Sequence, residues 1–128
     1  MKTNDINFDE DLEMTVCIPE QPDAVRLAIS DHLDAAAENL GGAYKEKIIR
    51  MIHDSSIWYP KAQEKILSDL SIPGRLMVIY LLSEQGDSDF VFGLLFRVEK
   101  DAEHGRGMKI SLGSMEILEY GLGDAAFC

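Results

Sequence analysis

The chain has few basic residues, and this shortage limits which partners it can bind. Lysine and arginine together number 12 against 23 aspartates and glutamates, which gives the 128 residues a formal net charge of −11. Nucleic-acid affinity comes largely from neutralising phosphates with lysine and arginine, so a nucleic acid is excluded as the main partner. Anionic membrane surfaces are disfavoured for the same reason. A basic protein is the favoured macromolecular partner, because complementary fields speed encounter and penalise wrong partners.

Long hydrophobic runs and cysteines are also scarce. No apolar run approaches the roughly 20 residues of a transmembrane helix. Residues 1–13 are acidic and lack the apolar centre of a signal peptide. We therefore expect a cytoplasmic protein without a membrane segment. The two cysteines, Cys17 and Cys128, lie almost at opposite ends of the chain, and in a reducing compartment we expect free thiols.

Motifs for catalysis and for metal binding are missing as well. No G-x-S-x-G sequence is present, and neither cysteine has the sequence context of a catalytic thiol. The histidines are far apart, without the H-x-x-x-H or C-x-x-C spacing of a zinc site. Phosphate-binding loops place glycines between a strand and a helix, whereas residues 105–107 join two expected strands. We therefore expect a non-catalytic protein with no cofactor and no metal.

What the chain does contain predicts one folded domain over residues 1–128, since 46% of its residues are hydrophobic. Apolar residues at helical spacing predict three helices, over residues 22–40, 43–53 and 60–70. Alternating apolar residues between residues 4 and 19 predict a strand, a turn and a second strand.

The C-terminal half changes from a helical to an extended pattern. Four strands are predicted, over residues 76–82, 90–98, 108–112 and 115–120, with a two-residue turn at Gly113-Ser114. The predicted fold is therefore α+β, with an antiparallel sheet and about three helices packed on one of its faces. The sheet would combine the C-terminal four-stranded meander with the N-terminal strand or hairpin.

The candidate contact residues are carboxylates in two segments, the N-terminal turn and the polar positions of the first expected helix. They are Asp9, Glu10, Asp11 and Glu13 in the turn, and Asp31, Asp34 and Glu38 in the helix. Their role would be to pair with lysine or arginine of a basic partner. The turn lacks the ligand spacing of an EF-hand, so calcium is not expected there, and a solvated turn is the simple alternative.

The end of the chain carries a resemblance. Residues 91–96 form a phenylalanine-containing strand, residues 101–107 read DAEHGRG, and residues 116–124 finish in a G-x-x-D turn. This combination resembles a group of small acidic bacterial domains of unknown function with a D-P-E-H-G-x-G loop, in which Ala102 here replaces the proline. Such domains resemble orphan proteins of bacterial toxin and immunity neighbourhoods. The resemblance implies an immunity role and carries over no catalytic residue.

Two functions from different classes are consistent with these patterns. The first is a binding protein that inhibits a basic toxin such as a nuclease. The second is a small-ligand binder or enzyme with a pocket between helices and sheet, for which Trp58, Tyr59, His104 and Arg106 are the residues to examine. The structural alternatives are core packing for the aromatic pair and a capped connection for residues 101–107. A second copy of the chain is a further candidate partner, through an exposed edge strand or an apolar helix face.

Overall fold

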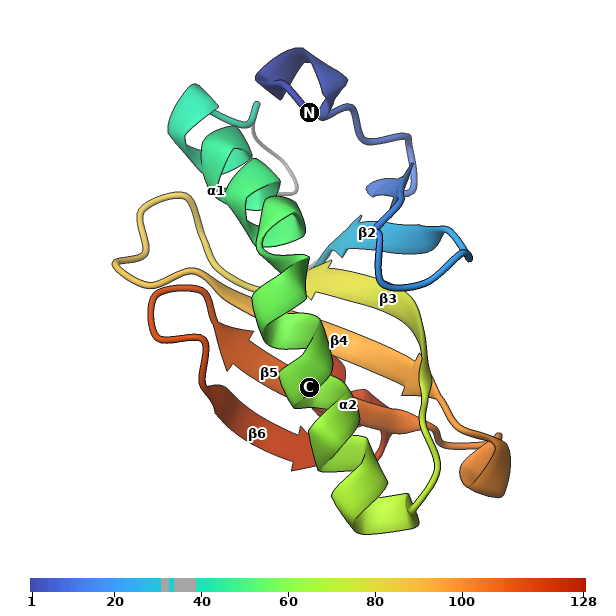
Figure 1. Ribbon diagram of the computed structural model, residues 1–128. Coiled ribbons are helices and arrows are strands. Elements are labelled where there is room, and N and C mark those ends of the chain that lie inside the picture. The colour runs from blue at the N-terminus through green and yellow to red at the C-terminus, as the bar shows by residue number, and fades with distance from the viewer. Residues whose placement is uncertain (31–32, 34–38) are drawn as a thin grey trace.

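The computed structural model describes residues 1–30, 33 and 39–128, and these form an α+β fold around one six-stranded sheet (Figure 1). The strands are β1 (Glu13–Val16), β2 (Val25–Ile29), β3 (Arg75–Leu81), β4 (Val91–Arg97), β5 (Arg106–Ser111) and β6 (Ile117–Gly121). The helices α1 (Gly42–His53) and α2 (Ser55–Leu70) lie across one face of this sheet. Short 3-10 helices are η1 (Thr3–Asp5), η3 (Glu99–Asp101) and η4 (Gly123–Ala126).

The strands are arranged in sequence order from β1 to β6. β2 and β3 are parallel, whereas every other neighbouring pair is antiparallel. A parallel pair requires a crossover connection, and α1 and α2 supply it between the end of β2 and the start of β3. The predicted α+β class is confirmed, and the C-terminal strands follow one another in antiparallel order. The prediction of an antiparallel sheet is wrong at the β2–β3 pair, so the sheet is mixed.

The expected helix over residues 22–40 is wrong in its first part, because Val25–Ile29 form a strand. Val25, Leu27 and Ile29 alternate along this strand and are buried in the core. Residues four apart, such as Val25 and Ile29, fit a helical stripe and a strand face equally well, so spacing in a short apolar run does not decide between them. Two helices rather than three therefore cover the sheet in the described part of the chain.

The remaining helices lie close to their predicted positions. α1 matches the prediction for residues 43–53, and α2 begins at Ser55 and contains Pro60 instead of starting there. Trp58 is consequently part of α2 and is fully buried. Its Nε1 donates to the Met51 carbonyl oxygen at 2.7 Å, and its ring meets Phe92 in a T-shaped contact with centroids 5.6 Å apart. This tryptophan ties both helices to the sheet as a core residue.

The other face of the sheet is partly covered by the C-terminal segment. η4 contacts β4 and β5, and the Phe127 ring packs on Tyr80 with centroids 5.0 Å apart. Glycine makes this close approach possible. A Cβ atom on Gly93 would lie 1.7 Å from the Ala126 carbonyl oxygen, and one on Gly107 would lie 2.5 Å from the oxygen of Gly123. The C-terminal segment is therefore a packed part of the fold.

Two predicted local details are wrong. The N-terminal segment forms η1 and irregular chain before β1, so the first expected strand is missing. The Gly113-Ser114 turn is a longer loop, closed where the Ser111 N–H donates to the Glu116 oxygen at 3.1 Å. Its left-handed residue is Met115, with a φ of 58°, rather than a glycine.

Both cysteines are free, as expected. None of the helices in the described ranges is long and apolar enough to cross a membrane.

Candidate binding surface at the acidic end of the sheet

The strand register brings three connections to one end of the sheet. β1 starts where β2 finishes, because the Ile29 N–H donates to the Leu12 oxygen at 3.0 Å. β3 runs parallel to β2 and finishes at the same end, where Ile29 pairs with Leu81. β5 also finishes here, since Ser111 pairs with Val91 at the start of β4. Figure 1 shows the β3–β4 and β5–β6 loops on the same side of the molecule.

We call this region, residues 9–13, 82–90 and 112–116, the acidic end. Its connections contain no lysine or arginine. Its carboxylates are those of Asp9, Glu10, Asp11, Glu13, Glu84, Asp87, Asp89 and Glu116. Neighbouring strands lie about 4.8 Å apart, so the distance from β1 to β5 is about 20 Å. That width is suited to contact with another protein rather than with a single small ion.

The turn before β1 is held by one of its own carboxylates. Asp9 Oδ1 accepts hydrogen bonds from the main-chain N–H groups of Asp11 at 2.9 Å and Glu13 at 3.0 Å. Asp9 therefore shapes the turn, as aspartates commonly do. Glu13 Oε2 lies 3.5 Å from Arg26 Nη1. The side chains of Glu10 and Asp11 are exposed and form no hydrogen bond or ion pair within the described ranges, which leaves both charges available to a partner.

The loop between β3 and β4 is anchored to its surroundings. Asp87 Oδ2 accepts a hydrogen bond from the Glu84 N–H at 2.8 Å. The buried Tyr44 hydroxyl donates to the Ser83 oxygen at 2.8 Å. Burial first, and then the negative charges of Glu84 and Asp87, raise the pKa of the Tyr44 hydroxyl to about 12. The loop is thus anchored by hydrogen bonds, and its negative charges contribute to the raised pKa of Tyr44.

The sequence-predicted contact residues divide into two groups. The four in the N-terminal turn, Asp9 to Glu13, lie at the acidic end. Asp31, Asp34 and Glu38 lie outside the described residues. Sequence reasoning missed the acidic residues of the β3–β4 and β5–β6 loops. The signal that could have found them is topological, because alternate connections of an antiparallel sheet emerge at the same end.

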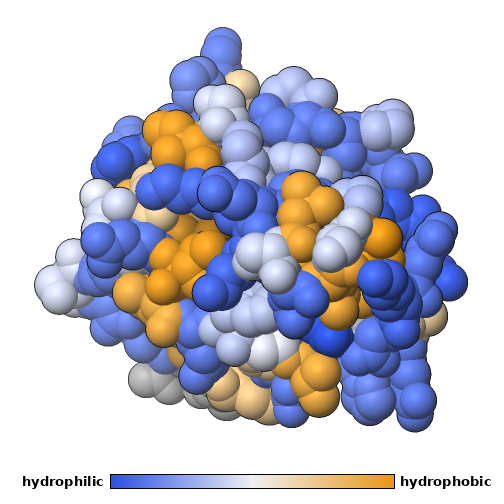
Figure 2. Space-filling model, turned by 60° about the horizontal axis from the view of Figure 1, so that its bottom comes forward, coloured by the Kyte–Doolittle hydropathy of each residue, from blue (hydrophilic) through white to orange (hydrophobic). Residues whose placement is uncertain are grey.

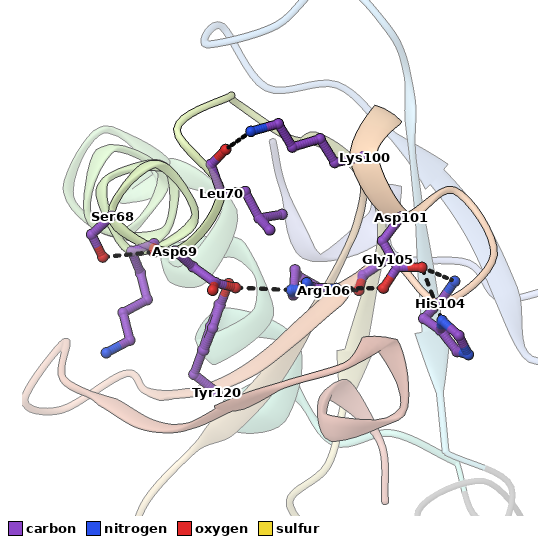
Figure 3. A network of polar contacts seen from close by, with 10 residues as sticks. Ser68, Asp69, Leu70, Lys100, Asp101, His104, Gly105, Arg106 and Tyr120 are labelled. Atoms are coloured by element: carbon purple, nitrogen blue, oxygen red, sulfur yellow. Dashed lines mark hydrogen bonds and ion pairs between the residues drawn. The ribbon is translucent and has the colours of Figure 1, made fainter.

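The second predicted set, Trp58, Tyr59, His104 and Arg106, does not converge on one cleft between the helices and the sheet. Trp58 is in the core, and the Tyr59 hydroxyl donates to Gln21 Oε1 at 3.0 Å. His104 lines a surface hollow of about 420 Å³. Arg106 lies in a polar network at the opposite end of the sheet from the acidic end (Figure 3).

The polar network is centred on Arg106, whose side chain is 13% exposed. Its Nε donates to Asp69 Oδ2 at 2.9 Å, and its Nη1 donates to Asp101 Oδ2 at 2.8 Å. The Tyr120 hydroxyl donates to Asp69 Oδ2 at 2.7 Å, and His104 Nδ1 lies 2.9 Å from Asp101 Oδ1. Figure 3 shows these side chains joining α2, η3 with the connection that follows it, β5 and β6.

The electrostatics of this network are those of satisfied ion pairs. Hydrogen bonds from Arg106 and then His104 lower the pKa of Asp101 to about 2. Hydrogen bonds from Tyr120 and then Arg106 lower the pKa of Asp69, and the hydrogen bond to Asp101 raises the pKa of His104. The hydrogen bonds from Arg106, His104 and Tyr120 thus favour the ionised form of both carboxylates. These bonds connect a helix, a turn and two strands, so we assign the network a structural role.

The connection over residues 101–107 also has the features of a capped turn. The Asp101 carbonyl oxygen accepts a hydrogen bond from the Gly105 N–H at 2.8 Å, and Asp101 Oδ1 accepts one from the His104 N–H at 3.3 Å. Gly105 has a φ of 67°, which glycine adopts at little cost.

The chain matches no protein-family model, no curated protein and no solved structure. In the residues that the structure describes, no group of three or more His, Cys, Asp or Glu is placed to hold a metal ion.

Apolar surface is the remaining feature that bears on partners. Figure 2 shows one face of the molecule, on which apolar clusters are separated by hydrophilic residues rather than joined in one continuous surface. At the β6 edge of the sheet, Leu118 is 54% exposed. That a second copy of the chain binds through this exposed edge strand stays a prediction.

Proposed function

We propose that the protein is a non-catalytic binding protein whose acidic end docks against a basic protein. The observation that carries this proposal is the convergence of carboxylates from three separate connections, with no lysine or arginine among them. The acidic end is predominantly negative, although Lys61 of α2 donates to the Met115 oxygen at 3.1 Å and Arg26 of β2 pairs with Glu13. A predominantly negative surface attracts a partner of opposite charge, speeds the encounter and rejects partners of like charge. Glu10 and Asp11 are the residues best placed to pair with the partner's lysines and arginines, because their side chains form no ion pair with any residue that the structure describes.

An immunity-type inhibitor of a basic toxin, acting in the cytoplasm, is the specific role that we propose. A nuclease binds a polyanion, so its active site offers a cationic surface to which the acidic end is complementary. The resemblance of residues 91–124 to small acidic domains near toxin and immunity loci supports the same class of function.

The proposal is tested on a partner captured from the native host or encoded beside this chain's gene. The variant Glu10→Gln/Asp11→Asn removes two charges from the acidic end without touching Asp9, which shapes the turn. The control Glu103→Gln/Asp124→Asn removes the same number of charges from exposed positions at the opposite end of the sheet, where the Gly123 N–H donates to the His104 oxygen. Association rates are measured by surface plasmon resonance at low and at physiological salt.

We expect the acidic-end variant to slow association about tenfold at low salt and to weaken the salt dependence, because the lost charges act in steering. The control at the opposite end should keep the wild-type rate. Equal slowing by both variants would show that only the net charge matters, and would reject the acidic end as the contact surface.

A further inference from the structure

Two arginines face one another at the end of the sheet opposite the acidic end. Arg75, the first residue of β3, is the direct cross-strand partner of Arg97, the last residue of β4. Directly opposed residues project on the same face with their Cβ atoms about 5 Å apart. Like charges in this position repel one another, so the pair favours the approach of a negatively charged group.

Within the described ranges, these two guanidinium groups form no ion pair with a protein carboxylate. The other arginines, Arg26, Arg50 and Arg106, each lie within an ion pair with a carboxylate. In the part of the chain that the structure describes, neither Arg75 nor Arg97 has a carboxylate oxygen within the 4.0 Å of an ion pair.

The pair lines a hollow of about 460 Å³ on the surface. This volume lies within the range of small-molecule sites. The other lining residues are Ile72, Pro73, Gly74 and Glu99. Arg97 also lines the neighbouring hollow, where Met77 and Leu95 are apolar neighbours, so the two spaces adjoin. A ligand would therefore meet two guanidinium groups beside apolar surface, with one carboxylate, that of Glu99, in the first hollow.

The main chain around Arg75 is held in place by two glutamine side chains. Gln63 binds both main-chain groups of Gly74: its Nε2 donates to the Gly74 oxygen at 2.6 Å, and its Oε1 accepts from the Gly74 N–H at 3.0 Å. Gln21 binds both groups of Leu76 in the same way, at 2.9 Å and 3.1 Å. The residues on either side of Arg75 are thus fixed before any ligand arrives, which lowers the cost of binding.

We propose that Arg75 and Arg97 bind the phosphate group of a small organic phosphate monoester, whose organic part rests on the apolar wall beside them. Two planar guanidinium groups offer paired N–H donors that match the oxygens of a dianionic phosphate. A phosphate monoester offers three free oxygens to these donors, whereas a carboxylate ligand offers only two. The site is separate from the acidic end, so this proposal and the proposed function can fail independently.

Binding is measured by following the arginine Nε–Hε signals of the full chain by NMR. The chain is titrated with inorganic phosphate, phenyl phosphate and benzoate at constant ionic strength. The variants Arg75→Gln and Arg97→Gln each remove one guanidinium group. Arg50→Gln is the matched control, because its side chain on α1 is 61% exposed and lies far along the sequence from the pair. Signal dispersion shows whether each variant is folded.

We expect phenyl phosphate to shift the signals of Arg75 and Arg97, with tighter binding than inorganic phosphate and with benzoate the weakest. Each single variant should weaken phenyl phosphate binding about tenfold, while Arg50→Gln binds like the wild type. The proposal is overturned if the two signals do not shift, or if Arg50→Gln weakens binding as much as Arg97→Gln. Equal affinity for phenyl phosphate and inorganic phosphate would overturn the part of the proposal that concerns the apolar wall.

Discussion

Replacing Gly93 by alanine tests whether the C-terminal segment is packed on the sheet. The added Cβ would lie 1.7 Å from the Ala126 carbonyl oxygen and 2.7 Å from its carbonyl carbon. Both atoms belong to the main chain, so no side-chain rotation can make room. The segment that contains η4 must move away from β4, or β4 must distort.

The expected cost follows from what the displacement removes. Overpacking a well-packed site costs about 1–3 kcal/mol. Moving the segment also exposes Ala126, now fully buried, and separates Phe127 from Tyr80, an aromatic contact worth about 0.5–1.5 kcal/mol. We expect Gly93→Ala to lower the free energy of unfolding by about 3 kcal/mol. With a urea m-value of about 2 kcal/mol/M, the unfolding midpoint falls by about 1.5 M.

Trp58 provides the assay, because it is the only tryptophan and is fully buried, so its fluorescence reports unfolding. Gly86→Ala is the matched control, since a Cβ there meets nothing within 4 Å. That control should leave the free energy of unfolding unchanged or raise it by up to about 1 kcal/mol. A Gly93→Ala midpoint equal to that of Gly86→Ala would refute the packing of the C-terminal segment on β4.

The other predictions concern the polar network and the support of β3. Arg106→Gln should lower the melting temperature by several degrees, because it removes the shared partner of the Asp69 and Asp101 carboxylates. Breaking the exposed ion pair between Arg50 and Asp54 should change the melting temperature little. The hydrogen bond to Asp101 raises the pKa of His104, so its stabilisation is complete below the ordinary pKa of 6.5 and is lost as the pH rises through the raised value. The difference in melting temperature between wild type and His104→Gln should therefore shrink from pH 6 to pH 8, and a constant difference would contradict the pairing. The pKa of Asp101 is lowered from 3.8 to about 2, so its stabilisation is present above pH 4 and lost between about pH 4 and pH 2, and Asp101→Asn should flatten acid unfolding in that window. Gln63→Ala should lower the free energy of unfolding by about 1–2 kcal/mol in a urea titration, since it leaves two main-chain groups unpaired; an unchanged midpoint would show that water replaces the glutamine at no cost.

The elements with a long or unambiguous pattern were predictable from sequence. The apolar stripe of residues 43–53 led directly to α1, and the extended runs led to the four C-terminal strands. Residues 25–29 were not predictable by the same means, because their spacing suits a helix and a strand alike. Their strand conformation depends on pairing with β3, whose residues are about 50 positions away in sequence, a distance that local patterns do not reach.

The acidic end was only partly predictable for a related reason. The carboxylates of residues 9–11 are adjacent in the sequence, so the sequence alone identifies them as an acidic segment. Those of Glu84 and Glu116 are scattered in the sequence, and only the alternation of strand direction brings their loops to one end of the sheet. The opposed pair of Arg75 and Arg97 likewise depends on the register between β3 and β4.

The parallel pairing of β2 with β3 has a consequence for how the chain folds as it is synthesised. β1 and β2 are synthesised before β3, and β3, the parallel neighbour of β2, follows only after both helices have been made. An isolated two-stranded hairpin is marginally stable, and its apolar residues stay uncovered during this interval. Non-local pairing of this kind forms slowly, so we expect the N-terminal hairpin to be the part of the nascent chain most exposed to aggregation.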